Sequence, residues 1–169
     1  MNENLALLRL RDAWRECERH VHHLRHALSA LNPILPLAGE RFERLNDDEV
    51  QAMDQFVLRF TKLQDCMGVR LFSALLQYLE EPYDDRPMLD KLNRLEKLGF
   101  IESAEKWQEI RVLRNKFAHD YPDDSEKNAM QINLACEVAS DLFGILKKIV
   151  SKLQVEYPEL ALGCLPETV

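Results

Sequence analysis

The sequence predicts an all-α fold, an antiparallel bundle of about five helices. Apolar residues recur at intervals of three and four along several long stretches, which is the spacing of a buried helix face. With 5 glycines and 7 prolines in 169 residues, the chain is poor in the residues that strands and tight turns require. Long helices with short connections pack as antiparallel neighbours. We expect a single domain over residues 1–157, followed by a loose C-terminal tail over residues 158–169.

The two longest helices of the first half of the chain are predicted by their apolar faces. The first covers roughly residues 7–31, and Pro33 and Pro36 end it. Its apolar face consists of Leu7, Leu10, Trp14, Cys17, Val21, Leu24, Leu28 and Leu31. The second follows Asn46, a residue typical of helix N-caps, and continues to about residue 78. Its apolar face turns polar at Gln64.

Local start and stop signals delimit the next two helices. A short helix is predicted over residues 87–98, with Gly99 as its C-terminal stop. The following helix begins near Ser103. We expect it to end around His119 or Asp120, because the Tyr-Pro sequence that follows disfavours helical geometry.

The last predicted helix begins at a capping box formed by Asp123 and Glu126, and its apolar face runs from Ile132 to Leu153. We expect no stretch of the chain to be long and apolar enough to span a membrane, and the N-terminus lacks the apolar run of a signal peptide. These expectations favour a cytoplasmic protein without a membrane partner.

The net charge and the cysteine spacing bear on whether the chain binds nucleic acid, forms disulfides or holds a metal. The net charge of −7 argues against sequence-blind binding to nucleic acid, but 22 lysines and arginines leave room for a local basic site. The four cysteines show no Cys-x-x-Cys spacing, and we expect reduced thiols rather than a disulfide or a metal site. They are Cys17, Cys66, Cys136 and Cys164.

The segment RNKFAHDY, residues 114–121, places a guanidinium on the apolar side of a predicted helix. Arg114 shares that face with Ile110 and Phe117, so it must either pair with a carboxylate or line a cleft. Asp65 lies where the second long helix turns polar, and it is a candidate partner for Arg114. The alternatives are a purely structural salt bridge for the arginine and a solvated carboxylate for Asp65.

His119 lies in the expected last turn of the same helix. The negative end of the helix dipole and the adjacent Asp120 favour its charged form, whereas Arg114 disfavours it. A histidine under such opposed influences can titrate near neutrality and act as an acid or a base. The alternative is a histidine that only caps the helix end.

Taken whole, the pattern Arg-Asn-x3-His-x-Tyr resembles the signature of the HEPN superfamily. The matching residues are Arg114, Asn115, His119 and Tyr121. Within that superfamily the chain is most similar to HepT-type toxins, which pair with a minimal nucleotidyltransferase antitoxin. Outside the motif the resemblance is one of helix pattern over about residues 1–155.

The resemblance implies the toxin of a type VII-like toxin–antitoxin system, a metal-independent endoribonuclease that needs no cofactor and acts as a homodimer on RNA. Arg114 and His119 would be catalytic, with Asn115, Asp120 and Asp65 in support. Tyr121 would accept AMP from the nucleotidyltransferase, which silences the toxin. Two alternatives remain: a non-catalytic HEPN-type binding partner of a nucleotidyltransferase, and a helical scaffold without activity.

Two other groups of polar residues have compositions that a metal site could use. In RHVHHLRH, residues 19–26, His22 and His26 have the spacing of zinc ligands on a helix, yet we expect a solvated polar face, or a surface for anions or RNA at acidic pH. The acidic segments at residues 83–85 and 121–124 are expected to be turns and caps rather than magnesium sites.

Overall fold

The computed structural model confirms the all-α fold, and it describes residues 2–119 and 124–163, which contain no β-strand. The helices are α1 (Asn2–Leu31), α2 (Gly39–Phe42), α3 (Asp47–Asp65), α4 (Phe72–Tyr78), α5 (Met88–Lys97), α6 (Ala104–Lys116) and α7 (Ser125–Glu156). A π-helical segment, η2 (Cys66–Leu71), joins α3 to α4 without a break, so that both form one long helix. The one-turn helix α2 was not predicted.

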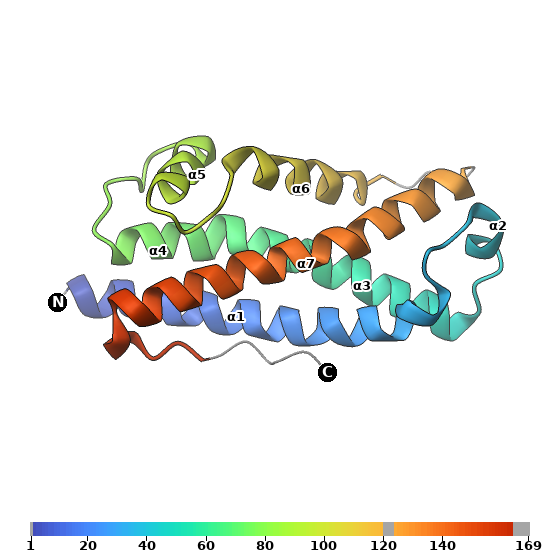
Figure 1. Ribbon diagram of the computed structural model, residues 1–169, viewed down its shortest axis with the longest axis horizontal. Coiled ribbons are helices and arrows are strands. Elements are labelled where there is room, and N and C mark those ends of the chain that lie inside the picture. The colour runs from blue at the N-terminus through green and yellow to red at the C-terminus, as the bar shows by residue number, and fades with distance from the viewer. Residues whose placement is uncertain (1, 120–123, 164–169) are drawn as a thin grey trace.

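The helices pack as an elongated bundle (Figure 1). α1 and the α3–α4 helix run antiparallel along its length and share an extensive contact. α5 and α6 lie along the other side of α4 and α3, and α7 crosses the bundle diagonally and returns to the end where the N-terminus lies. The one-turn helix α2 packs against the beginning of α7.

Capping residues and a glycine fix several helix ends as the sequence predicted. The Asn46 side chain accepts the N–H of Glu49, and the Glu49 carboxylate accepts the N–H of Asn46, which completes a capping box. Ser103 caps α6 by accepting the N–H of Lys106 at 3.1 Å. Gly99, after α5, has a φ of +79°, a conformation that glycine adopts without strain.

Two predicted helix ends are wrong by a few residues. α6 ends at Lys116 rather than at His119 or Asp120, because the N–H groups of residues 117, 118 and 119 bond three residues back and tighten the chain into a turn. The N-cap of α7 is Asp124, whose carboxylate accepts the N–H of Lys127. The predicted partner in a capping box, Glu126, instead accepts the N–H of Gly39, and Asp123 lies outside the described residues.

The beginning of the C-terminal tail is packed rather than loose. Leu160 and Leu162 are buried against the core. The Trp14 indole donates a hydrogen bond to the carbonyl of Gly163 at 3.1 Å, and Arg11 donates one to the carbonyl of Leu160. The tail up to residue 163 therefore belongs to the domain, because its two leucines are apolar enough to join the core.

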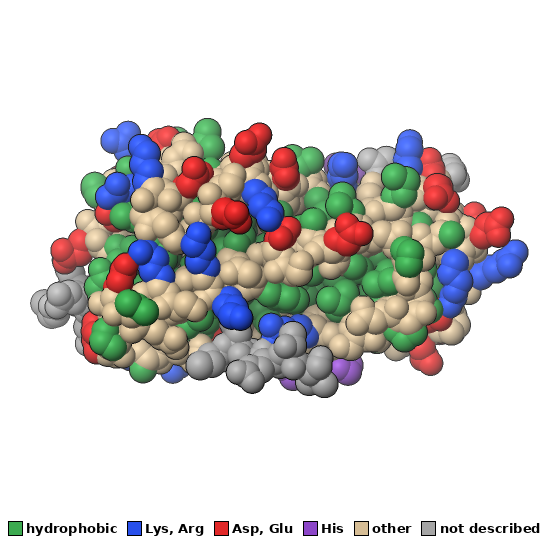
Figure 2. All heavy atoms as spheres, viewed as in Figure 1, with side chains coloured by type: hydrophobic (Ala, Val, Ile, Leu, Met, Phe, Trp, Pro, Cys, Tyr) green, Lys and Arg blue, Asp and Glu red, His purple; other side chains and the backbone are tan. Residues whose placement is uncertain are grey.

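The surface around α7 combines charged and apolar side chains. Acidic and basic side chains are interspersed on this face, and a strip of hydrophobic side chains is visible between α7 and α1 (Figure 2). Contrary to our expectation, α7 is long and apolar enough to cross a membrane by length and composition. Its buried stripe packs into the bundle, however, and the core helix of a soluble protein has the same composition.

Candidate active site

The candidate site lies where α6 packs antiparallel against α3 and η2. Three contacts set the register of the two helices. They are Trp107 against Gly68 and Phe72, Arg114 against Asp65, and Phe117 against Phe60. The two aromatic contacts have ring centroids 4.7 Å and 5.8 Å apart. They flank the polar pair, so apolar packing on both sides holds Arg114 opposite Asp65.

Arg114 forms an ion pair with Asp65, which was one of the predicted alternatives for these residues. Its Nη2 donates to Asp65 Oδ2 at 2.6 Å, and its Nη1 donates to Asn115 Oδ1 at 3.3 Å. The side chains of Arg114 and Asp65 are 28% and 43% exposed. Nε of Arg114 is buried and has no hydrogen-bond partner among the described residues. The guanidinium is thus a half-buried cation whose position is fixed from two directions.

His119 lies in the turn after α6 and is exposed. Its backbone N–H bonds to the carbonyl of Lys116, and its imidazole makes no hydrogen bond with a described residue. Asn115, one residue after Arg114, is also exposed. The structure therefore brings Arg114, Asn115 and Asp65 together and leaves the imidazole of His119 accessible to solvent. Two further predicted residues, Asp120 and Tyr121, lie outside the described residues.

The π-helical segment η2 beside the site was not predicted. It begins at Cys66, directly after Asp65, and contains Gly68. A Cβ atom added to Gly68 would lie 3.2 Å from Trp107 Cζ2, so glycine permits the close approach of α6. Insertions of this kind occur frequently at functional sites, because the extra residue shifts side chains around the helix axis. The glycine inside an apolar helical pattern was the signal that could have indicated this feature.

Gln64, which interrupts the apolar face predicted for the second helix, is buried with 4% exposure. Asp65 beside it is exposed enough to meet both Arg114 and solvent. The two polar residues at this point of the helix therefore differ: Gln64 is buried, and Asp65 lies at the surface.

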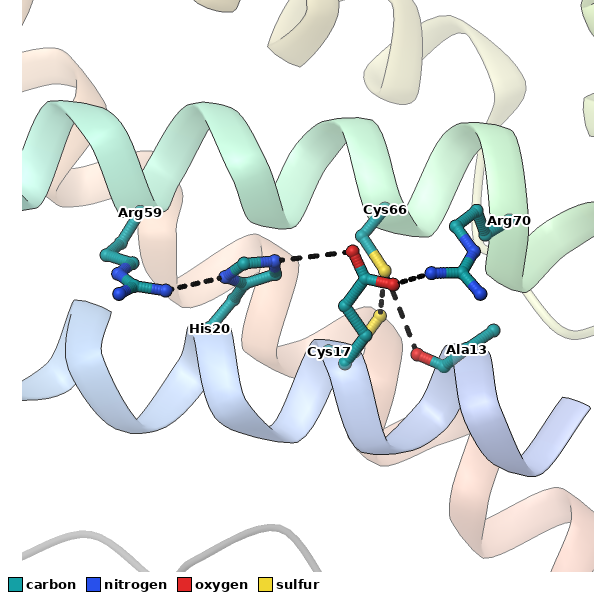
Figure 3. Close-up of polar contacts among 7 residues, drawn as sticks. Ala13, Cys17, His20, Arg59, Cys66 and Arg70 are labelled. Atoms are coloured by element: carbon teal, nitrogen blue, oxygen red, sulfur yellow. Dashed lines mark hydrogen bonds and ion pairs between the residues drawn. The ribbon is translucent and has the colours of Figure 1, made fainter.

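The histidine-rich segment of α1 differs from the expected solvated face at one position. His22 and His26 are exposed, but His20 is buried. Nδ1 of His20 accepts a hydrogen bond from Arg59 Nη1 at 3.1 Å, and its Nε2 lies 3.7 Å from a carboxylate oxygen of Glu16 (Figure 3). Burial and the neighbouring Arg59 lower the pKa of His20, so the neutral ring is favoured.

Metal-binding residues do not gather anywhere in residues 2–119 and 124–163. No group of three or more histidine, cysteine, aspartate or glutamate side chains there is placed to hold an ion. This covers His22 and His26 on α1 and the acidic segment at residues 83–85. The segment at 121–124 lies outside these ranges except for Asp124, which is a helix cap.

Arg114 can supply positive charge to a phosphate, and His119 can transfer a proton. Basic side chains on the same helix, Arg111 and Lys116, are exposed and add local positive charge. Such a combination is suited to phosphoryl chemistry on an anionic substrate.

No protein-family model, curated protein or solved structure matches this chain.

Proposed function

We propose that this chain is a metal-independent endoribonuclease, the toxin of a type VII-like toxin–antitoxin system, and that it acts in the cytoplasm as a homodimer without a cofactor. The observation that carries the proposal is the placement of the motif that resembles the HEPN signature. Arg114 is held in a half-buried position by Asp65, and His119 follows in an exposed turn. A fixed guanidinium and, five residues later, an accessible imidazole would meet two needs of RNA cleavage.

In the proposed reaction the 2′-hydroxyl of the RNA attacks the adjacent phosphorus. A base removes the proton of that hydroxyl, and an acid protonates the 5′-oxygen as its bond to phosphorus breaks. The products are a cyclic phosphate and a free 5′-hydroxyl. Arg114 stabilises the negative charge that develops on the phosphorane oxygens, because a guanidinium donates two parallel hydrogen bonds to such oxygens.

The homodimer supplies what one chain lacks in this mechanism. The motif contains one histidine, whereas the reaction needs both a base and an acid. A two-fold axis next to α6 brings two copies of Arg114 and His119 into one cleft. Asn115, which already accepts a hydrogen bond from Arg114, is free to turn its amide towards the imidazole or a phosphate oxygen. Asp120 keeps the supporting role that the resemblance implies.

Expression in a bacterium tests the proposed function. We expect the wild-type chain to arrest growth and His119→Ala to restore it, because loss of a general acid or base lowers such rates about 10²–10⁴-fold. The purified wild type should cleave RNA in the presence of EDTA and leave cyclic phosphate ends. Equal harmlessness of both chains at equal expression would instead favour the non-catalytic binding partner or the scaffold. Cleavage that requires added magnesium would contradict the mechanism.

The partner of the proposed toxin is a minimal nucleotidyltransferase that transfers AMP to Tyr121. An adenylyl group there places a phosphodiester anion next to the motif, where Arg114 would capture it in place of RNA. We expect Tyr121→Phe to remain toxic and to escape neutralisation, since it lacks the accepting hydroxyl. Mass spectrometry of the co-expressed wild type should find AMP on the peptide that contains Tyr121. A neutralised wild type without this adduct would indicate inhibition by binding alone.

A further inference from the structure

The contact between α1 and η2 encloses two thiols that touch each other. The Sγ atoms of Cys17 and Cys66 are 3.4 Å apart, and the two residues are 0% and 4% exposed. Both are free thiols, and Cys66 also donates a weak hydrogen bond to the carbonyl of Ala13. Figure 3 shows the two sulfur atoms pointing towards each other from facing helices. We propose that Cys17 and Cys66 form a redox-active pair that peroxide converts into an intramolecular disulfide.

The geometry of the pair is close to that of a disulfide. A disulfide bond is about 2.05 Å long, so the two sulfur atoms must approach each other by roughly 1.4 Å. α1 and η2 are already packed together at this point. The proposed disulfide therefore requires the two side chains to rotate and the backbone of one of these elements to shift.

The two thiols differ in reactivity. The hydrogen bond from Cys17, together with the nearby cation Arg19, lowers the pKa of Cys66, although burial opposes this. The hydrogen bond to Cys66, assisted by burial, raises the pKa of Cys17. Since the thiolate is the nucleophile, Cys66 reacts first with an oxidant and Cys17 completes the disulfide.

In the proposed reaction a small oxidant enters through the polar surface between α1 and η2, where two hollows lie beside the pair. The Glu16 carboxylate forms an ion pair with Arg70 and lies 3.7 Å from Nε2 of His20. The Arg70 side chain is 53% exposed, and ion pairs this exposed are weak. Two hollows of about 430 and 450 Å³ are both lined by Arg70, and the second is also lined by Ala13, the hydrogen-bond acceptor of Cys66.

The proposed oxidation proceeds in two balanced steps. The Cys66 thiolate attacks one oxygen of hydrogen peroxide, the O–O bond breaks, and Cys66 sulfenic acid and hydroxide form. The Cys17 sulfur then attacks the sulfenic sulfur, the S–O bond breaks, and water leaves as the disulfide forms. The proton that the Cys66 thiol released on ionisation neutralises the hydroxide. The two thiols are thus oxidised, and one peroxide molecule is reduced to two molecules of water.

The disulfide also acts on the candidate active site. Cys66 directly follows Asp65, the partner of Arg114. Drawing the sulfur of Cys66 towards α1 moves the backbone that carries Asp65, so oxidation changes how Arg114 is held. Through this chain of contacts, the redox state of the pair modulates the proposed ribonuclease. This last step rests on the proposed function, whereas formation of the disulfide does not.

Peptide mapping of the full chain after treatment with hydrogen peroxide tests the proposal. We expect a cross-linked pair of peptides containing Cys17 and Cys66, with a mass lower by two hydrogen atoms and restored by a thiol reductant. Cys136 is the internal control, because burial raises the pKa of its thiol to about 12. Cys17 and Cys66 should lose reactivity towards iodoacetamide, measured after unfolding, at least about tenfold faster than Cys136 does.

Variants separate the two cysteine roles. In Cys17→Ser, a sulfenic acid should accumulate at Cys66 and be trapped by dimedone, whereas Cys136→Ser should form the disulfide at the wild-type rate. The disulfide should raise the melting temperature of the wild type by roughly 10 °C, because it closes a long loop in the unfolded chain. The proposal is overturned if Cys17 and Cys66 stay reduced while Cys136 or Cys164 oxidises, or if only cross-links between chains form.

Discussion

Replacing Arg114 with alanine is expected to lower the rate of RNA cleavage by about 10²–10³-fold and to leave the bundle folded. The rate falls because the phosphorane loses hydrogen bonds that are strongest in the transition state. The fold persists because the ion pair with Asp65 is partly exposed, and pairs of this kind contribute about 1 kcal/mol or less. Single-turnover cleavage of a labelled RNA, with circular dichroism of the same samples, measures both effects.

Matched variants distinguish a catalytic Arg114 from a structural one. Arg111→Ala removes the same charge from an exposed position on α6, and it should change cleavage only a fewfold. Arg114→Lys keeps the charge but loses the planar fork, so its rate should lie between those of the wild type and the alanine variant. If Arg114→Ala and Arg111→Ala cleave RNA equally fast, Arg114 is only a salt bridge.

The features that were predicted correctly are determined by residues that are close together in the sequence. Asn46 and Glu49 exchange side-chain hydrogen bonds within one turn, and Gly99 follows α5 with a φ of +79°. The apolar face of α1 is likewise a property of one helix, and Trp14 on it is fully buried as expected. Such features depend on contacts close in sequence, so spacing and residue type are sufficient to predict them.

The errors arise where distant segments compete for the same residue. Glu126 was expected to complete a capping box for α7. Its carboxylate instead accepts the N–H of Gly39 at the start of α2. The end of α6 is tightened into a turn where the ring of Phe117 packs edge to face against Phe60. The environment of His20 includes Arg59 of α3, which is 39 residues away, so the sequence of α1 alone does not indicate that His20 is buried. Each outcome follows from tertiary packing, which cannot be predicted from the spacing of apolar residues in one segment.

The candidate site was predicted in part for the same reason. Arg114 had to be paired or to line a cleft because it lies among apolar neighbours, and Asp65 was a reasonable partner because the opposite face turns polar. Which carboxylate meets the arginine depends on the register of α6 against α3. That register depends on η2, whose wide turn and close contact with Trp107 became visible only in the structure. The cysteine pair was missed likewise, since Cys17 and Cys66 lie on different helices.

Trp107 is therefore expected to be the side chain on α6 whose loss most damages the protein. It is buried with 1% exposure, packs against the tilted ring of Phe72 and contacts Gly68 of η2. Trp107→Ala should lower the free energy of unfolding by about 3–5 kcal/mol, because burial is lost and a cavity remains. Urea unfolding followed by circular dichroism measures this, and Val112→Ala, at an exposed position of α6, should change it by about 0.5 kcal/mol or less.

The same substitution tests how the site is held in place. Trp107 sets the distance between α6 and η2 on one side of the Arg114–Asp65 pair, and Phe117 contacts Phe60 of α3 on the other. If this packing positions the arginine, Trp107→Ala should slow RNA cleavage at a low temperature where the variant remains fully folded, and Val112→Ala should not. A Trp107→Ala protein as stable as Val112→Ala would contradict the assigned packing, whatever the function of the chain. A destabilised variant with the wild-type cleavage rate would show that Asp65 and Phe117 alone hold Arg114 in position.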